Sequence, residues 1–135
     1  MFSGTVARMR ELVGLVESLD LSRSVAVAVT EYEARDFSLV DVNQAGCTKG
    51  ATLSEWVARQ GLTPAEVMAV GDNLNDRDML AFAGLPVVMG NAVEPLKRMG
   101  WAVTADNDHG GVALAIERHV LGRTPEAGPA GRREC

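Results

Sequence analysis

An apolar run at residues 67–70 ends abruptly in a glycine and two acids, and this junction constrains the fold more than any other part of the chain. A short run without polar residues is typical of a strand buried on both faces of a sheet. Gly71 permits a sharp turn after it, and Asp72 and Asp76 follow four residues apart. Open α/β sheets bind ligands at the carboxyl ends of their strands. With the asparagines between them, the two carboxylates form an oxygen-rich group suited to Mg²⁺ and a phosphate.

Two other interpretations of the junction have to be weighed. Acids at the start of a helix can simply cap it, and this alternative stays open. The spacing also resembles a calcium-binding loop, but Leu74 stands where a ligand oxygen is required and Arg77 where glycine is required. Ala83 occupies the twelfth position, which needs glutamate. We therefore reject the calcium loop.

The first third of the chain has a different texture from the rest. Apolar residues at helical spacing predict an amphipathic helix over residues 6–19. Residues 24–32 and 36–43 are β-rich and are joined by a short polar turn, which predicts an antiparallel hairpin. Residues 44–48 then form a linker. We interpret this part as a small α+β unit.

After the linker, helix and strand patterns alternate. This succession predicts an α/β fold with a parallel sheet, right-handed crossovers and helices on both faces. The tail from residue 123 to residue 135 is rich in Gly, Pro, Ala and Arg, and we expect it to be disordered. The expected helices lie around residues 53–57, 76–82, 91–99 and 108–121, and the expected strands at 67–70, 85–89 and 102–105.

Composition excludes several classes of function. The formal net charge of −5 and the pI near 5.0 argue against a nucleic-acid partner. The sequence has no apolar stretch of membrane-spanning length and no basic start followed by an apolar segment, so we expect neither a membrane span nor a signal peptide. Two cysteines, Cys47 and Cys135, do not make a disulfide framework, which favours a reduced, cytoplasmic setting.

Two further polar residues stand where a phosphate site would need them. Lys49 lies at the start of the first helix after the linker, where its charge opposes the helix dipole unless an anion is near. Taken alone it is an exposed loop lysine; with the acids downstream it is a candidate phosphate ligand. Asn91 follows the second strand at the same sheet edge, and either helix capping or ligand contact would explain it. Residues 106–109 favour a solvated loop in which Asp108 caps the last helix.

Together these motifs resemble the C-terminal half of a haloacid dehalogenase superfamily phosphatase of the Cof type, which carries an α/β cap inserted in its core. The resemblance covers roughly residues 24–121 and depends on the combination of motifs, since no single motif is specific. The matching segments are Lys49-Gly50, Gly71-Asp72-Asn73-Leu74-Asn75-Asp76 with Met79-Leu80, Val88-Met89-Gly90-Asn91-Ala92 and Gly110-Gly111-Val112-Ala113.

The resemblance implies a role for each matched residue. It implies that Lys49 is the catalytic lysine, which steadies the phosphoryl group, and that Asp72 and Asp76 bind Mg²⁺. Asn75 and Asn91 match positions that arrange the acids or contact substrate. The implied substrate is a small phosphorylated metabolite, and the hairpin would be the closing part of the cap. On this basis residues 1–45 are a cap remnant with one helix and a hairpin, and residues 46–122 are the C-terminal half of the core.

The resemblance also has a gap. The family's nucleophile is an aspartate in an Asp-x-Asp motif that precedes the cap, and no such triplet precedes the linker. We therefore expect the isolated chain to be an inactive part of a phosphatase; the alternative is a non-catalytic module that binds Mg²⁺, phosphate or another protein. The strand at 67–70 would lack its family neighbour, and its open apolar edge predicts a homodimer or association with a complementing N-terminal half.

Overall fold

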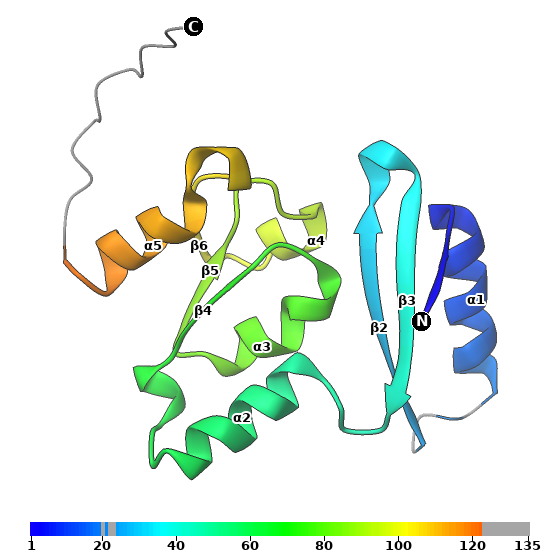
Figure 1. The fold of residues 1–135 in the computed structure, drawn as a ribbon, viewed down its shortest axis with the longest axis horizontal. Coiled ribbons are helices and arrows are strands. Elements are labelled where there is room, and N and C mark those ends of the chain that lie inside the picture. Colours follow the sequence, from blue (N-terminus) through cyan, green and yellow to red (C-terminus); the bar gives the residue numbers. More distant parts are fainter. Residues whose placement is uncertain (20, 22–23, 123–135) are drawn as a thin grey trace, which may run out of the picture.

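The protein contains two three-stranded sheets that lie side by side, one antiparallel and one parallel (Figure 1). The computed structural model describes residues 1–19, 21 and 24–122. The antiparallel sheet has the order β1-β3-β2. It is built from β1 (Phe2–Gly4), β2 (Val25–Tyr32) and β3 (Phe37–Gln44), with α1 (Val6–Ser18) between β1 and β2 and the 3-10 turn η1 (Glu33–Arg35) between β2 and β3.

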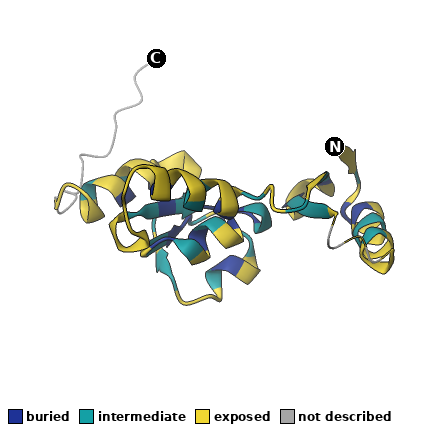
Figure 2. Ribbon diagram, turned by 90° about the horizontal axis from the view of Figure 1, so that it is seen from below, coloured by how far each residue is buried: buried dark blue, intermediate teal, exposed yellow. Residues whose placement is uncertain are grey.

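The two faces of the antiparallel sheet have different neighbours. Helix α1 covers the face away from the parallel sheet, where Val6 and Met9 of the helix and Val40 of β3 are buried (Figures 1 and 2). On this face the Glu31 carboxylate accepts two hydrogen bonds from the Arg10 guanidinium, at 3.0 and 2.8 Å. The opposite face turns toward the parallel sheet, because side chains alternate along a strand.

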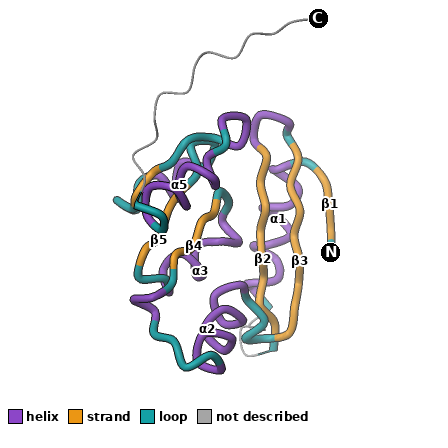
Figure 3. The backbone as a smooth tube through the Cα atoms, turned by 60° about the vertical axis from the view of Figure 1, so that its left-hand side comes forward, coloured by secondary structure: helices purple, strands orange, loops and turns teal. Residues whose placement is uncertain are grey.

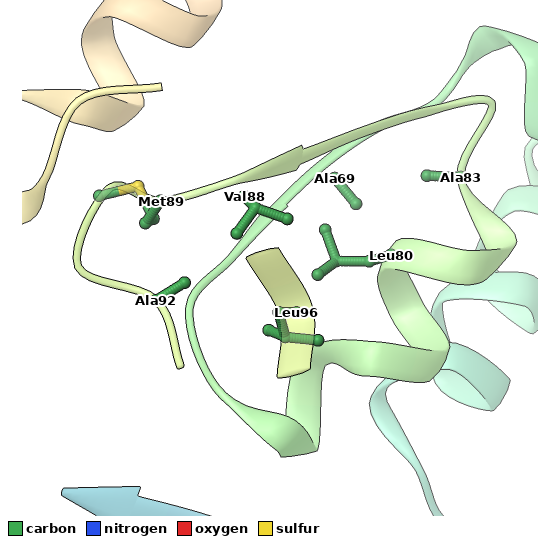
Figure 4. Packing of buried hydrophobic residues seen from close by; sticks show 7 residues of the cluster. All are labelled: Ala69, Leu80, Ala83, Val88, Met89, Ala92 and Leu96. Atoms are coloured by element: carbon green, nitrogen blue, oxygen red, sulfur yellow. The ribbon is translucent and has the colours of Figure 1, made fainter. Parts of the chain in front are cut away.

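The parallel sheet is built from β4 (Met68–Gly71), β5 (Leu85–Val88) and β6 (Ala102–Val103) in the order β4-β5-β6, so β4 and β6 are its edge strands within the described residues. Helix α2 (Lys49–Arg59) packs on α3 (Arg77–Phe82), and α3 packs on β4 and β5. A buried cluster joins α3 to β4, β5 and the helix that contains Leu96 (Figure 4). Leu80 and Leu96 lie at its centre, and burying one such side chain contributes about 1.5–3 kcal/mol. The elements are α2 (Lys49–Arg59), η2 (Pro64–Glu66), β4 (Met68–Gly71), η3 (Leu74–Asp76), α3 (Arg77–Phe82), β5 (Leu85–Val88), α4 (Glu94–Lys97), β6 (Ala102–Val103), η4 (Asn107–His109) and α5 (Gly111–His119).

The predicted α/β class is confirmed, including the hairpin and the parallel sheet. Strand β1, which pairs with β3 at Ser3↔Leu39, was not predicted, so the first part is a three-stranded sheet rather than a helix and a hairpin. Helix α4 is much shorter than the predicted segment at 91–99. The predicted disordered tail at 123–135, with Cys135, lies outside the described residues. The division at residue 45 stays a prediction.

Neither Asn91, for which capping was one of two alternatives, nor Asp108 caps a helix. Helix α4 is preceded by Val93, not by Asn91, which leaves the Asn91 side chain for other partners. Asp108 lies inside η4, and Asp106 caps that turn by accepting the His109 N–H. Gly110 adopts a positive φ of 67° between η4 and α5, a conformation that favours glycine. No helix of the described residues is long and apolar enough to cross a membrane.

Candidate functional site

Asp76 is the centre of the candidate site. It ends η3 and is only 5% exposed. Its Oδ2 accepts the backbone N–H groups of Asp72 at 3.0 Å and Asn73 at 3.2 Å. Its Oδ1 accepts a hydrogen bond from the Lys49 ammonium and forms an ion pair with it. One carboxylate therefore fixes the turn after β4 and joins it to the first residue of α2.

Gly71 makes this turn possible. A Cβ atom at this position would lie 2.6 Å from the Cβ of Asp76 and 2.9 Å from its Oδ2. Contacts that short do not occur between real side chains, so Asp76 would have to move. The glycine that sequence analysis assigned to a sharp turn thus also provides the space in which the Asp76 carboxylate folds back onto the end of β4.

Asp72 and Asn91 meet at the ends of neighbouring strands. The Asn91 Nδ2 donates to Asp72 Oδ2 at 3.1 Å, and the Asn91 Oδ1 accepts the Asn107 N–H at 3.0 Å. The Asp72 carbonyl accepts the Val93 N–H at 3.0 Å. Asn91 thus connects the segments that follow β4, β5 and β6. Sequence analysis placed Asn91 at this edge but gave no sign of the bond from Asn107.

Lys49 opens α2, where Thr48 is the N-cap and accepts the Ala51 N–H at 3.1 Å. The Asp76 carboxylate is itself an anion that offsets the unfavourable position of the Lys49 charge at the start of the helix, so this position needs no phosphate to explain it. Asp78 supports the same helix end, because its Oδ2 accepts the Gly50 N–H at 3.1 Å. Asp78 was not singled out from the sequence, although it lies two residues beyond the predicted ligand Asp76.

The turn after β4 is also bonded to the hairpin. The Asn73 side chain pairs with the backbone of Glu31: its Nδ2 donates to the Glu31 carbonyl at 2.8 Å, and its Oδ1 accepts the Glu31 N–H at 3.1 Å. Asn75 Nδ2 donates to Thr30 Oγ1 at 2.8 Å. Both Asn73 and Glu31 are buried. These three bonds fasten β2 to the loop that carries the acids, and their partners lie more than forty residues away in the sequence.

The structure thus separates the predicted site residues into groups. Lys49 with Asp76, and Asp72 with Asn91, form bonded pairs, and the loop 72–76 connects the pairs. The Asn75 amide instead reaches Thr30 on β2. Besides Asp78, sequence reasoning missed the role of Asn73, which it counted only as one more oxygen near the acids.

The donor set fits a metal that needs few protein ligands. Within the described residues, no three His, Cys, Asp or Glu side chains form a metal-binding group. Asp72 is partly exposed, and its Oδ1 takes no hydrogen bond from the described residues. Mg²⁺ prefers carboxylate oxygens, keeps several waters and is completed by substrate phosphate. Asp72, with Asp76 beside it, is consistent with such a site, whereas a closed all-protein cage is not available.

Two clefts open between the hairpin and the parallel-sheet part, and they share no lining residue. The cleft of about 680 Å³ contains Lys49 and Asn75 on one wall and Asp41 of β3 on the other. The cleft of about 550 Å³ contains Asp72 and Asn91 on one wall and the end of β2 with η1 on the other. The predicted lysine and the predicted metal ligand Asp72 therefore face different clefts.

Two further groups of charged side chains form local pairs. The Glu31 and Glu33 carboxylates hydrogen-bond to the Arg10 guanidinium and raise its pKa above the ordinary value. The His109 ring, hydrogen-bonded to Asp106, lowers the pKa of that carboxyl. The cluster at 106–109 thus forms a loop that is capped by Asp106 and not by the predicted Asp108.

The chain belongs to the haloacid dehalogenase-like hydrolase family, whose model matches residues 19–116. The Cof-type resemblance is confirmed. The chain is 40% identical over 82 residues to the pyridoxal phosphate phosphatase YbhA of Escherichia coli K12, a match over 61% of this chain and 30% of that protein. It is 43% identical over 82 residues to the 5-amino-6-(5-phospho-D-ribitylamino)uracil phosphatase YcsE of Bacillus subtilis 168, over 61% of this chain and 33% of that protein.

Solved structures agree with the sequence matches. A haloacid dehalogenase-like hydrolase from Bacillus subtilis superposes with a TM-score of 0.69 at 29% identity and covers 88% of this chain. The phosphatase BT1666 from Bacteroides thetaiotaomicron gives a TM-score of 0.65 at 33% identity over 80% of this chain. The match covers 40% of the first structure and 38% of the second, and about a third of the length of the curated relatives.

Proposed function

We propose that this chain provides the Mg²⁺- and phosphate-binding part of a phosphomonoester hydrolase. The observation that carries the proposal is the bonding of Asp76, which joins Lys49 to the turn that presents Asp72 at the carboxyl end of β4. Family membership supports it, since Mg²⁺ is typical of these hydrolases. The relatives' names support a small phosphorylated metabolite as the substrate class.

In this proposal each polar residue has a defined task. Asp72 and Asp76 hold Mg²⁺, which neutralises charge on the phosphate when bound. The Lys49 ammonium lines the neighbouring cleft, but Asp76 joins it to the turn that carries Asp72, and from this position it offsets further negative charge on the phosphoryl group. Asn91 keeps the Asp72 carboxylate oriented through its 3.1 Å hydrogen bond. Asn75, whose amide nitrogen is bound to Thr30, retains its oxygen for a substrate contact.

The attacking carboxylate is assigned to a different polypeptide segment. Residues 1–48 contain no Asp-x-Asp triplet, and β4 pairs with β5 on one side only within the described residues. We propose that a strand carrying the nucleophile pairs with the open edge of β4, contributed by a complementing N-terminal half. A second copy of the chain is the other occupant that this edge allows. Sedimentation at micromolar concentration distinguishes an associating chain from a monodisperse monomer.

Hydrolysis of p-nitrophenyl phosphate with Mg²⁺ tests the function. We expect no turnover by the chain alone and turnover when the N-terminal half of a relative such as YbhA is added. Asp72→Ala should abolish the restored activity, whereas Glu55→Ala, on the exposed surface of α2, should leave it intact. Restored turnover that survives Asp72→Ala would overturn the assignment of the site.

The alternative function is binding of Mg²⁺ or phosphate without hydrolysis. The observation that favours it is the lack of an Asp-x-Asp triplet before the linker, beside an intact Lys49–Asp76 pair. The same assay separates the two functions. Mg²⁺-dependent phosphate binding without turnover, even after the complementing half has been added and shown to associate, supports the non-catalytic module.

A further inference from the structure

The end of the hairpin presents an aromatic surface to the cleft that contains Asp72. Side chains alternate along β2, so neighbours point to opposite faces. The Glu31 side chain meets Arg10 of α1 on the outer face. The Thr30 hydroxyl accepts a bond from Asn75 on the inner face. Tyr32 therefore shares the inner face with Thr30, and it lines the cleft of about 550 Å³.

Tyr32 does not stand alone on this face. In the hairpin register it pairs directly with Phe37 of β3, so both rings lie on the same face. Their centroids are 6.3 Å apart, and the ring planes differ by 24°. Tyr32 is 44% exposed and Phe37 38% exposed, although large aromatic side chains usually bury much of their surface. Phe37 thus stacks beside Tyr32, which is the member of the pair that lines the cleft, and no described residue covers the Tyr32 ring fully.

The surface is held in place from two sides. Asp36 closes the hairpin turn in a left-handed conformation, with a φ of 44°. Its Oδ1 accepts the Val6 N–H at the start of α1, at 3.1 Å. On the other side, the paired bonds between Asn73 and Glu31 fasten the residue before Tyr32 to the acidic loop. The aromatic pair is thus positioned relative to Asp72 by bonds rather than by a free loop.

Across the cleft the lining is polar and rich in oxygen. Asp72 and Asn91 line it, and Asn107 lies beside them. We propose that this cleft binds phosphomonoesters of planar, unsaturated rings, with the phosphate toward Asp72 and the ring stacked on Tyr32. This substrate class deepens the proposed function and rests on it. A volume of about 550 Å³ lies within the roughly 300–1,000 Å³ range of small-molecule sites.

Matched ligands test the proposal without requiring turnover. Phenyl phosphate and cyclohexyl phosphate carry the same phosphate on six-membered rings, and only the first ring is planar and aromatic. Binding of each, and of inorganic phosphate, is measured by isothermal titration calorimetry with Mg²⁺. We expect the full chain to prefer phenyl phosphate over cyclohexyl phosphate by roughly two- to tenfold, the range that aromatic pairing supplies.

Variants assign the preference to the surface. Tyr32→Leu should remove most of the preference for phenyl phosphate, whereas Tyr32→Phe should retain it. Trp56→Leu is the matched control, because Trp56 is an exposed aromatic residue on α2 that lines neither of the two clefts. It should leave the ratio of the two affinities unchanged. Circular dichroism confirms that each variant is folded.

The outcomes separate this proposal from the proposed function. Equal affinity for the two ring phosphates, or a preference that survives Tyr32→Leu, overturns the ring site and leaves the phosphate site standing if Asp72→Asn still abolishes Mg²⁺-dependent binding of inorganic phosphate. If inorganic phosphate binds equally with and without Asp72, the proposed function fails, and the ring site fails with it.

Discussion

The two sheets of this protein differ in how much they bury, and the candidate site lies where they meet. The parallel sheet has its own cluster of buried side chains around Leu80 and Leu96 (Figure 4). The antiparallel sheet buries few residues against α1, mainly Val6, Met9 and Val40. In Figure 3, β2 lies nearer to the parallel-sheet part than β3 does, and β2 contacts η3 of that part. A well-packed part thus holds the acids, and a less packed part provides the opposite wall of each cleft.

The difference indicates that one part of the molecule positions the site residues and the other part forms the opposite walls of the clefts. Asp72, Asp76 and Lys49 are held by elements of the parallel-sheet part, so their arrangement should persist when the hairpin moves. The cleft walls depend on three side-chain bonds between β2 and the loop 72–76. Surface opposite the acids can therefore change without dismantling the phosphate site. The predictions below test this division.

The largest effect is expected in the core of the parallel sheet. Leu80 is 0% exposed, so Leu80→Ala should lower the free energy of unfolding by about 2–5 kcal/mol. Leu15→Ala, at a 58% exposed position on α1, should change it by less than about 0.5 kcal/mol. Urea denaturation measures both. Similar losses in the two variants would contradict the central place of Leu80 in the core of the parallel sheet.

The next effect concerns the turn after β4. Gly71→Ala forces a Cβ against Asp76, which should cost about 1–3 kcal/mol of stability and weaken Mg²⁺ binding. Gly14→Ala is the matched control, since no heavy atom lies within 4 Å of the added Cβ in α1. That change should stabilise the protein by about 0.5–1 kcal/mol. Opposite signs in thermal denaturation are the expected result; a neutral Gly71→Ala would show that the close approach does not hold Asp76.

A smaller effect is expected at the contact between the sheets. Asn73→Ala removes both side-chain hydrogen-bond partners of the Glu31 backbone. Because a buried polar group without a partner is costly, the free energy of unfolding should fall by about 1–2 kcal/mol. Asn75→Ala removes one bond to Thr30 and should cost about 0.5–1.5 kcal/mol. Hydrogen exchange should speed up at the Glu31 amide in Asn73→Ala, with Leu80 still protected. Unchanged exchange at Glu31 would argue against the contact.

The smallest effect is a pH dependence at η2. The Glu66 carboxylate accepts hydrogen bonds from the backbone N–H and the hydroxyl of Thr63. These bonds, the backbone one most, lower the pKa of Glu66 below its ordinary value of 4.5. A carboxyl with a lowered folded pKa contributes stability above its unfolded pKa, and this contribution is lost as the pH falls through the folded pKa. Glu66→Gln should therefore flatten the acid side of the stability curve. Denaturation on both sides of pH 4.5 measures the change, and an unaltered curve would contradict it.

The sequence predicted the parts of the fold that rest on local patterns. The apolar runs at residues 67–70 and 85–89 became β4 and β5, because burial on both faces requires such runs. Strand β1 was missed because three residues, Phe2–Gly4, are too few to show an alternation. Helix α4 is shorter than predicted and has Pro95 in its first turn. The residues before it are held by other bonds: the Val93 N–H donates to the Asp72 carbonyl, and the Asn91 side chain donates to the Asp72 carboxylate.

The candidate site, like the fold, was predictable where it rests on local motif spacing. Motif spacing selected Lys49, Asp72, Asp76 and Asn91, and the structure places them in two bonded pairs. The pairing of Asn73 with Glu31 could not be predicted, because a backbone partner forty-two residues away leaves no pattern in the sequence. The aromatic surface was missed for a related reason: Tyr32 and Phe37 become neighbours only in the hairpin register.

The central claim is that the turn after β4 binds Mg²⁺ through Asp72. The most direct test is a Mg²⁺ titration of the full chain followed by amide NMR, with Asp72→Asn as the comparison. We predict saturable shifts at the amides of Asp72 and Asn73 and at the Asn91 side chain, and none of these in Asp72→Asn. No saturable shift at these groups, or the same shifts in Asp72→Asn, would contradict the account.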